Sequence, residues 1–184
     1  MLTGGASSRM GADKALLALH GHPLATIAAA ALVEAGAREV FTVGGDRAGL
    51  RAAGLDARAD DHPGQGPLGG LLTALRLAGQ PVVVVLSCDM PVIDGPTVAL
   101  LVGALARDPE AQVAAPVIDG LVQGITAAYR GDAAPVLAQA FHGGERAVRR
   151  AIRGLRLAPV LGVDPARLVD VDRPDDLRRY AAPS

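Results

Sequence analysis

Short, strongly apolar segments that alternate with segments of helical periodicity constrain the fold of this 184-residue chain more than any other feature. The clearest apolar segment is PVVVVL at 81–86, a continuous run that is typical of a strand in a sheet covered on both faces. The preceding segment, PLGGLLTALRLAG at 67–79, runs from proline to glycine with the apolar spacing of a helix. Such alternation predicts a mainly parallel sheet with right-handed crossovers.

The same alternation extends along most of the chain. Helices are predicted at 23–36 and 96–107, and further strands at 39–43, 111–117 and 124–130. The remainder is less regular, with two more helices and a tail at 168–171. No linker, repeat or low-complexity tract is found, and the length suits one domain. We therefore predict a single three-layer α/β/α domain over 1–184 with a mainly parallel central sheet.

Composition and charge narrow the functional classes. The formal net charge is only −1, so no overall field favours nucleic acid or a membrane surface as a partner. Cys88 is the only cysteine, which excludes an internal disulfide and a CxxC metal site. No leader and no membrane-spanning run is found, and we expect a soluble, cytoplasmic protein. Met1-Leu2-Thr3 is short for the first strand of an α/β domain. We expect that a late start codon assignment or lost upstream residues explain this.

Three pairs of residues follow directly after predicted strands: Gly4-Gly5, Gly44-Gly45 and Cys88-Asp89. In parallel α/β sheets, ligands bind beyond the carboxyl ends of the strands, near the switch in strand order. We therefore expect these three pairs to converge on one rim of the sheet and to form a binding site there.

The opening segment LTGGASSRMGADK at 2–14 has the composition of a phosphate-binding loop. Small residues let backbone N–H groups approach phosphate oxygens, and Arg9 and Lys14 add positive charge suited to a triphosphate. The GxxxxGK[ST] pattern of a P-loop is absent. The GxGxxG fingerprint is absent too, which disfavours an NAD-dependent oxidoreductase. A mobile surface loop is the alternative interpretation, because glycine also marks turns.

The opening segment and three later motifs resemble those of a known family. LTGGASSRMGADKALL is similar to the L-x-G-G-x-x-x-R-M-G-x-D-K-x-L-L opening of the molybdenum cofactor guanylyltransferases, which are nucleotidyltransferases with one Rossmann-like domain. Asp60 before GPLGG at 66–70 resembles the acid and G-P-L-A-G of the family, and CDMP at 88–91 matches its C-D-M-P. The tail DVDRPDDL at 170–177 is similar to the closing N-x-N-T-P-E-D-L.

The resemblance implies where the nucleotide binds. Lys14 would hold the phosphates, and its charge would stabilise the α-phosphate more strongly as negative charge develops there in the transition state. Arg9 would support the same oxygens. The implied nucleotide-binding set is Leu2, Thr3, Gly4, Gly5, Lys14, Gly44, Asp60, Gly66, Pro67, Leu68 and Asp89. Relatives that transfer cytidine read A-A-G at the opening, so the opening and GPLGG together resemble the version that selects guanine.

Two acidic positions are candidate magnesium ligands. Asp89 stands at the end of the valine-rich strand, and Mg²⁺ is usually bound through one or two carboxylates while it keeps several waters. An ordinary acid before a helix is the alternative for Asp89. Asp170 stands where the family has asparagine and is a hypothetical second ligand. A cluster of acids at a helix start, from Asp172 onward, is the alternative for this tail.

Other polar residues have less specific interpretations. Asp61 is interpreted as solvated, and we do not expect His62 to bind a metal. Arg146, Arg149, Arg150 and Arg153 have helical spacing and predict a basic face, with an apolar stripe on the other side. That face is either solvated or receives the phosphate of an anionic pterin, for which GER at 144–146 favours Arg146. Cys88 is expected to be a buried small hydrophobe.

Together these features predict a GTP:molybdenum cofactor guanylyltransferase, with 1–95 as the nucleotide-binding half and 96–184 as the molybdopterin-binding half. Its expected cofactor is Mg²⁺, its expected small-molecule ligands are GTP and molybdopterin, and its expected protein partners are other molybdenum-cofactor biosynthesis or chaperone proteins. A CTP-dependent cytidylyltransferase is the nearest rival. A nucleotide-binding homologue without catalysis is the rival from another class, suggested by the substitutions in the tail.

Overall fold

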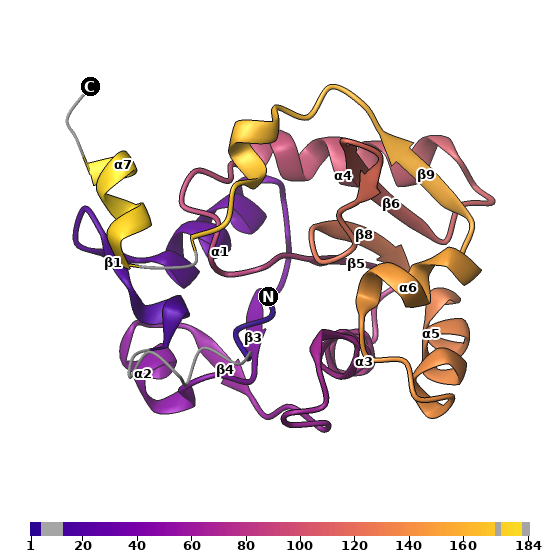
Figure 1. Ribbon diagram of the computed structural model, residues 1–184, viewed down its shortest axis with the longest axis horizontal. Coiled ribbons are helices and arrows are strands. Elements are labelled where there is room, and N and C mark those ends of the chain that lie inside the picture. The colour runs from indigo at the N-terminus through magenta and orange to yellow at the C-terminus, as the bar shows by residue number, and fades with distance from the viewer. Residues whose placement is uncertain (5–12, 172–173, 182–184) are drawn as a thin grey trace.

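A mixed sheet runs through the centre of the molecule, with helices on both of its faces (Figure 1). The computed structural model describes residues 1–4, 13–171 and 174–181. The described helices are α1 (Leu24–Glu34), α2 (Arg47–Ala52), α3 (Pro67–Ala78), α4 (Gly95–Arg107), α5 (Ala133–His142), α6 (Val148–Ala151) and α7 (Arg178–Ala181). The described strands are β1 (Ala18–Leu19), β2 (His22–Pro23), β3 (Phe41–Val43), β4 (Asp56–Arg58), β5 (Val82–Val85), β6 (Val113–Ile118), β7 (Leu121–Val122), β8 (Ala127–Arg130) and β9 (Leu157–Val160).

The first three residues join two parts of the sheet. Val43 N–H donates to Met1 O (2.9 Å) and Thr3 N–H donates to Val43 O (3.1 Å), which pairs the segment with β3. On its other side Leu2 N–H donates to Leu86 O (2.9 Å), just after β5. Leu2 forms parallel bridges with Val43 and with Ser87. Met1–Thr3 therefore occupies the place of a central strand between β3 and β5.

The full strand order is β4, β3, Met1–Thr3, β5, β8, β6 and β9. The pairs β3–β4 and β6–β9 are parallel, whereas β8 runs antiparallel to both β5 and β6. β7 forms a short hairpin with the end of β6, and β1 pairs with β2 apart from this sheet. The prediction of a mainly parallel central sheet is confirmed, with β8 as the strand of opposite direction.

Two apolar layers cover the sheet. On one face α3, α5 and α6 bury a cluster that includes Leu71, Tyr129 and Leu137. On the other face α4 packs over β6, β8 and β9 through Leu101 and Leu105, and α1 packs beside it. Figure 1 shows α4 on one side of these strands and α3, α5 and α6 on the other. The three-layer architecture is confirmed.

The secondary structure departs from expectation in several places. α2 and the short strands β1, β2, β4 and β7 were not predicted. β9 was not predicted, because LAPV contains proline and is short; it forms because β6 offers it a parallel edge. The prediction that the strand at 81–86 is covered on both faces is wrong for its first half. Val82 is 38 % exposed, and Val83 and Val84 are only half-buried. Among the described helices, none is long and apolar enough to cross a bilayer.

Candidate active site

The carboxyl ends of the central strands bring three of the predicted positions together. Gly44 follows β3 with a φ of +81°, and a Cβ placed on it would lie 3.1 Å from Gly4 Cα and 3.8 Å from Asp60 Cβ. The loops after Met1–Thr3, β3 and β4 are therefore in close contact. Only a residue without a side chain fits at Gly44, since both its φ and its neighbours oppose a Cβ. The convergence expected for Gly4 and Gly44 is observed.

The opening residues contribute mainly through their backbone. The Leu2 side chain is buried in the main apolar cluster, and the Thr3 hydroxyl lies 3.0 Å from both Val43 O and Gly44 O. Thr3 therefore holds the loop after β3 against the first strand. Gly5 and Arg9 lie outside the described residues.

Asp13 fixes the position of Lys14. Lys14 begins a 3-10 helix at Lys14–Leu16, and Asp13 caps it by accepting from Ala15 N–H (3.0 Å). The other carboxylate oxygen of Asp13 accepts from Asp46 N–H at 2.6 Å, so it ties this turn to the loop after β3. Ala15 is fully buried and anchors the turn in an apolar cluster. Lys14 is thus held at the rim, half-buried.

The tail of the chain brings a second carboxylate to Asp89. Val171 N–H donates to Asp89 O (2.9 Å), which places Asp170 beside Asp89. Burial raises the pKa of the Asp89 carboxyl, and the Asp170 charge raises it further. The hydrogen bond from Ser87 Oγ and the charge of Lys14 both lower the pKa of Asp89. Two carboxylates and one ammonium therefore act on each other electrostatically at one rim.

This arrangement fits a hard divalent cation. Asp89 is half-buried and Asp170 exposed, so a cation between them would keep water ligands, as Mg²⁺ prefers. Two negative charges close together also raise the cost of leaving both carboxylates ionised without a cation. Within the described part of the chain, no group of three or more His, Cys, Asp or Glu side chains is placed to hold a metal. Among the described residues, the rim brings two candidate ligands together, Asp89 and Asp170.

Asp60 is held by a neighbouring threonine. Its Oδ1 accepts from Thr73 Oγ (2.9 Å) and from His62 N–H (2.9 Å). Thr73 is 1 % exposed, lies on α3 and also accepts from Asp61 N–H at 3.1 Å. Asp61 turns away and pairs with Arg76 (2.7 Å), so it is ion-paired as well as exposed. Of the two acids, Asp60 is the one that faces the rim glycines.

The GPLGG segment begins α3 and meets the second half of the chain. Gly66 has a φ of +82°, and a Cβ on it would lie 3.1 Å from both Cβ and O of Arg146. Leu68 N–H donates to Arg146 O at 3.1 Å. The Leu68 side chain is fully buried, whereas Pro67 is exposed at the start of the helix. The start of α3 is therefore fixed by the backbone of Arg146.

The prediction of a basic helix face that begins at Arg146 is wrong. α6 begins only at Val148. Gly143 and Gly144 follow the end of α5, and the Glu145 carboxylate accepts from Ala147 N–H (2.7 Å) in the turn between the two helices. Arg146 donates to Phe141 O (2.7 Å) and Glu145 O (2.8 Å), with its guanidinium 4.1 Å from the centre of the Phe141 ring.

The other residues of this segment keep to surface and core as expected. Arg150 pairs with Glu145, while Arg149 and Arg153 are exposed. The apolar stripe is confirmed, since all four of its members are buried: Val148, Ala151, Ile152 and Leu155. Cys88 is also buried, as expected, and burial raises the pKa of its thiol to about 12.

Three residues of the rim escaped the sequence analysis: Asp13, Thr73 and Ser87. Each holds another side chain or loop through a hydrogen bond. Asp13 is adjacent to Lys14, and Ser87 is two positions before Asp89. This proximity in the sequence is the signal that could have identified both residues. Thr73 is separated from Asp60 by thirteen residues, and only the packing of α3 brings the two together.

Comparison with known proteins identifies the family. The MobA-like NTP transferase domain matches residues 1–160. A "probable molybdenum cofactor guanylyltransferase" of Chloroflexus aggregans is 33 % identical over 99 % of this chain and 92 % of its own length. A "molybdenum cofactor guanylyltransferase" of Xanthomonas euvesicatoria is 45 % identical over 106 residues, which are 57 % of this chain and 51 % of that relative.

A solved structure supports the fold. The molybdopterin-guanine dinucleotide biosynthesis protein A of Archaeoglobus fulgidus superposes with a TM-score of 0.74 over 98 % of this chain and 94 % of its own, at 24 % identity. Together with the family match over most of the chain, this agrees with the three-layer domain described above. The chain belongs to the MobA-like NTP transferase domain family, a family of nucleotidyltransferases.

Proposed function

We propose that this protein transfers GMP from GTP to molybdenum-bound molybdopterin, which gives the guanine dinucleotide form of the molybdenum cofactor and releases pyrophosphate. The observation that carries the proposal is the meeting of Lys14, Asp89 and Asp170 at one rim, next to the close-packed glycines Gly4 and Gly44. The names of the Chloroflexus and Xanthomonas relatives support the choice of substrates.

The reaction needs charge neutralisation more than a nucleophilic side chain. A terminal phosphate oxygen of molybdopterin attacks the α-phosphorus of GTP, the new P–O bond forms, and the bond to the β-phosphate oxygen breaks with release of pyrophosphate. The attacking phosphate is already ionised near neutral pH, so no general base is required. The Lys14 ammonium stabilises negative charge that develops on the α-phosphate.

Asp89 and Asp170 would hold the magnesium ion. When bound there, Mg²⁺ would neutralise phosphate charge and orient the triphosphate. Ser87 keeps the Asp89 carboxylate directed by donating to its Oδ1. The rim is open to water on the Asp170 side, which leaves room for the phosphates and for the water ligands of the ion.

The nucleotide would lie against the backbone of the first strand. The Leu2 side chain lies in the core, and the N–H groups of Leu2 and Thr3 are bonded within the sheet, so the guanine and ribose would pack against this backbone without bonding to those N–H groups. Gly4 and Gly44 allow a close approach, and Asp60 stands at the same edge. Arg9, Gly5 and the start of α3 at Gly66–Leu68 complete the proposed nucleotide half, 1–95.

The molybdopterin half, 96–184, is proposed with a reduced role for Arg146. Its guanidinium is already held by two carbonyls and the Phe141 ring, so it would shape the site more than bind a phosphate directly. Mg²⁺ as cofactor, a cytoplasmic location and contacts with other proteins of molybdenum cofactor biosynthesis belong to the same proposal.

Pyrophosphate release tests this function. Purified protein is incubated with molybdenum-bound molybdopterin, Mg²⁺ and either GTP or CTP, and GTP-dependent release is expected. Release with CTP alone would identify a cytidylyltransferase. GTP that raises the midpoint of thermal unfolding without any turnover would identify a non-catalytic binding protein. Either of these two results contradicts the proposal.

A further inference from the structure

The tail that carries Asp170 is attached at two points to the loop after β5, which carries Asp89. Val171 N–H donates to Asp89 O (2.9 Å), and the Arg167 guanidinium donates from Nη1 to Val92 O (3.1 Å). The Asp170 side chain is exposed, and no described residue donates a hydrogen bond to its carboxylate. Because Asp170 lies between the two points of attachment, they determine how it stands relative to Asp89.

Arg167 also contacts the end of the same loop. Its Nε lies 3.4 Å from Asp94 Oδ2, while Asp94 Oδ1 accepts from Thr97 N–H (3.0 Å) and so caps α4. Arg167 itself belongs to a 3-10 turn at Pro165–Leu168, whose start is capped by Asp164. Figure 1 shows this turn, in gold, beside α4. The guanidinium therefore connects a short turn of the tail to the start of a long helix.

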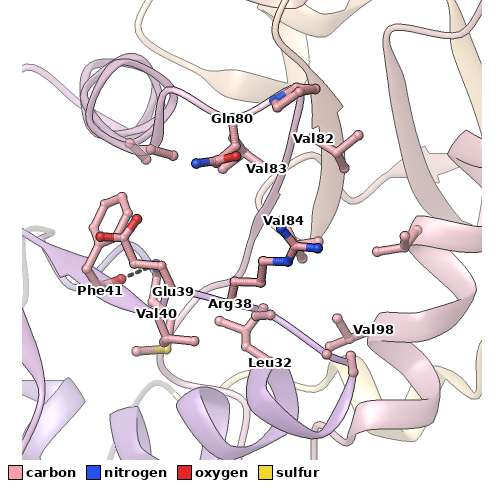
Figure 2. A pocket seen from close by; sticks show the side chains of 18 residues that line it. Leu32, Arg38, Glu39, Val40, Phe41, Gln80, Val82, Val83, Val84 and Val98 are labelled. Atoms are coloured by element: carbon pink, nitrogen blue, oxygen red, sulfur yellow. Dashed lines mark hydrogen bonds between the residues drawn. The ribbon is translucent and has the colours of Figure 1, made fainter.

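The loop after β5 is the fixed partner in this contact. Met90 and Ile93 are buried in an apolar cluster with Leu32 of α1 and Val98 of α4. Figure 2 shows Leu32 and Val98 next to each other along an apolar groove that α1 and α4 help to line. Residues 168–170 of the tail, in contrast, are half-buried or exposed, so their position depends on the attachment to this loop.

We propose that Arg167 is a positioning residue that holds Asp170 where it can share one divalent cation with Asp89. This role rests on the proposed function, in which the two carboxylates together hold Mg²⁺. The Arg167 and Asp94 side chains are 44 % and 29 % exposed, and ion pairs of such exposure contribute little to global stability because water screens them. The effect of Arg167 is therefore local, on cation binding and not on unfolding.

Charge and position predict opposite effects of removing the guanidinium. A nearby positive charge repels a divalent cation, so a residue that acted only through its charge would strengthen cation binding when removed. A residue that holds Asp170 in place would weaken cation binding when removed, because the second carboxylate would lose its fixed position. The direction of the change in affinity therefore distinguishes the two roles.

Manganese binding to the nucleotide-free protein tests the proposal without any turnover. Mn²⁺ takes the same oxygen ligands as Mg²⁺, and its free concentration is measured by electron paramagnetic resonance. Arg167→Met is expected to weaken Mn²⁺ binding about tenfold and to leave the midpoint of thermal unfolding nearly unchanged. Arg167→Lys, which keeps the charge, should recover part of the affinity. Arg149→Met, which removes an exposed arginine of α6, is the matched control and should bind Mn²⁺ normally.

A double variant shows whether Arg167 acts through Asp170. If Arg167→Met adds no further loss of Mn²⁺ affinity in the Asp170→Asn background, the proposal is supported. Unchanged or stronger binding in Arg167→Met, additive losses in the double variant, or a large fall in the unfolding midpoint would overturn it. An unchanged affinity in Asp170→Asn, or no Mn²⁺ binding by the unmodified protein, would overturn it too, because Arg167 would have no ligand to position.

The proposed function fails in a different measurement. Pyrophosphate release with GTP is assayed separately on the unmodified protein. Absence of release together with Mn²⁺ binding that depends on Arg167 would contradict GMP transfer and still support the role of Arg167 at the cation site.

Discussion

At the scale of single residues, the rim works through pairs in which one side chain holds another. Asp13 holds the turn of Lys14, Ser87 holds Asp89, and Thr73 holds Asp60. The first member of each pair has no predicted contact with the nucleotide. Its substitution is therefore expected to act through the second member, which separates positioning from direct binding experimentally.

Removal of the Lys14 ammonium tests the central assignment. Lys14→Ala is expected to lower kcat for GMP transfer by about 10²–10³-fold, because the charge on the α-phosphate loses its fixed partner. Thermal unfolding should change little. Arg107→Ala, which removes an exposed charge at the end of α4, is the matched control and should retain activity. Near-normal turnover by the Lys14 variant would show that the phosphates bind elsewhere.

A double-mutant cycle tests whether Asp13 acts through Lys14. Asp13→Ala frees Ala15 N–H and Asp46 N–H and should lower kcat by about tenfold or more. In the Lys14→Ala background the same change should have little further effect on turnover, since the group that Asp13 positions is gone. Additive losses of kcat in the double variant would instead indicate two independent roles.

The two carboxylates are distinguished by their dependence on magnesium. Asp89→Asn and Asp170→Asn are each expected to raise the Mg²⁺ concentration needed for half-maximal activity, more strongly at the half-buried Asp89 than at the exposed Asp170. Asp176→Asn, on the same tail, serves as the control. An unchanged Mg²⁺ requirement in the Asp170 variant would remove it from the proposed ligands.

At the scale of elements, the start of α3 links the two halves of the site. Gly66 packs on the backbone of Arg146, and Leu68 N–H bonds to the same residue. The loop that leads into α3 carries Asp60, while Arg146 precedes α6. Any shift of the helix start would therefore move the nucleotide side of the rim relative to the second half of the chain.

Two glycines of this loop separate contact from backbone strain. Gly64→Ala and Gly66→Ala both place a Cβ at positive φ (+74° and +82°), but only the Cβ at position 66 meets neighbours, at 3.1 Å. We expect both variants to lose about 1 kcal/mol of stability, and Gly66→Ala to lose roughly a further 1–2 kcal/mol. Urea unfolding measures the difference. Equal losses would mean that the Arg146 contact yields without cost.

At the scale of the whole molecule, three residues connect the nucleotide-binding strands to the rest of the sheet. Met1–Thr3 pairs with β3 on one side and bonds to Leu86 on the other, and Leu2 also enters the main apolar cluster. The segment that leads to the proposed phosphate-binding loop is thus also the seam of the sheet. Stability and the geometry of the rim are coupled at this seam.

The buried amine at the seam predicts a pH dependence. Its pKa falls from 8.0 to about 6 on folding, so the unfolded chain binds the proton more tightly than the folded protein. The free energy of unfolding is therefore highest above pH 8 and decreases as the pH falls through 6, by roughly 2–3 kcal/mol in all. Urea unfolding between pH 6 and 8 measures it, with the N-terminally acetylated chain as reference. Parallel pH profiles for the two chains would contradict the burial of a charged amine.

The sequence by itself determined the longer helices and strands and the order of the motifs. Apolar periodicity placed the helix at 67–79 and the strand at 81–86, and glycine pairs after strands located the rim, because both signals are local in the chain. Only the tertiary structure decided which side chains hold others. Thr73 reaches Asp60 and Asp170 reaches Asp89 through the packing of α3 and the tail, over separations that no local pattern encodes. Arg146 does not lie on the predicted helix face. Its guanidinium instead bonds to the carbonyl groups of Phe141 and Glu145 and packs on the Phe141 ring.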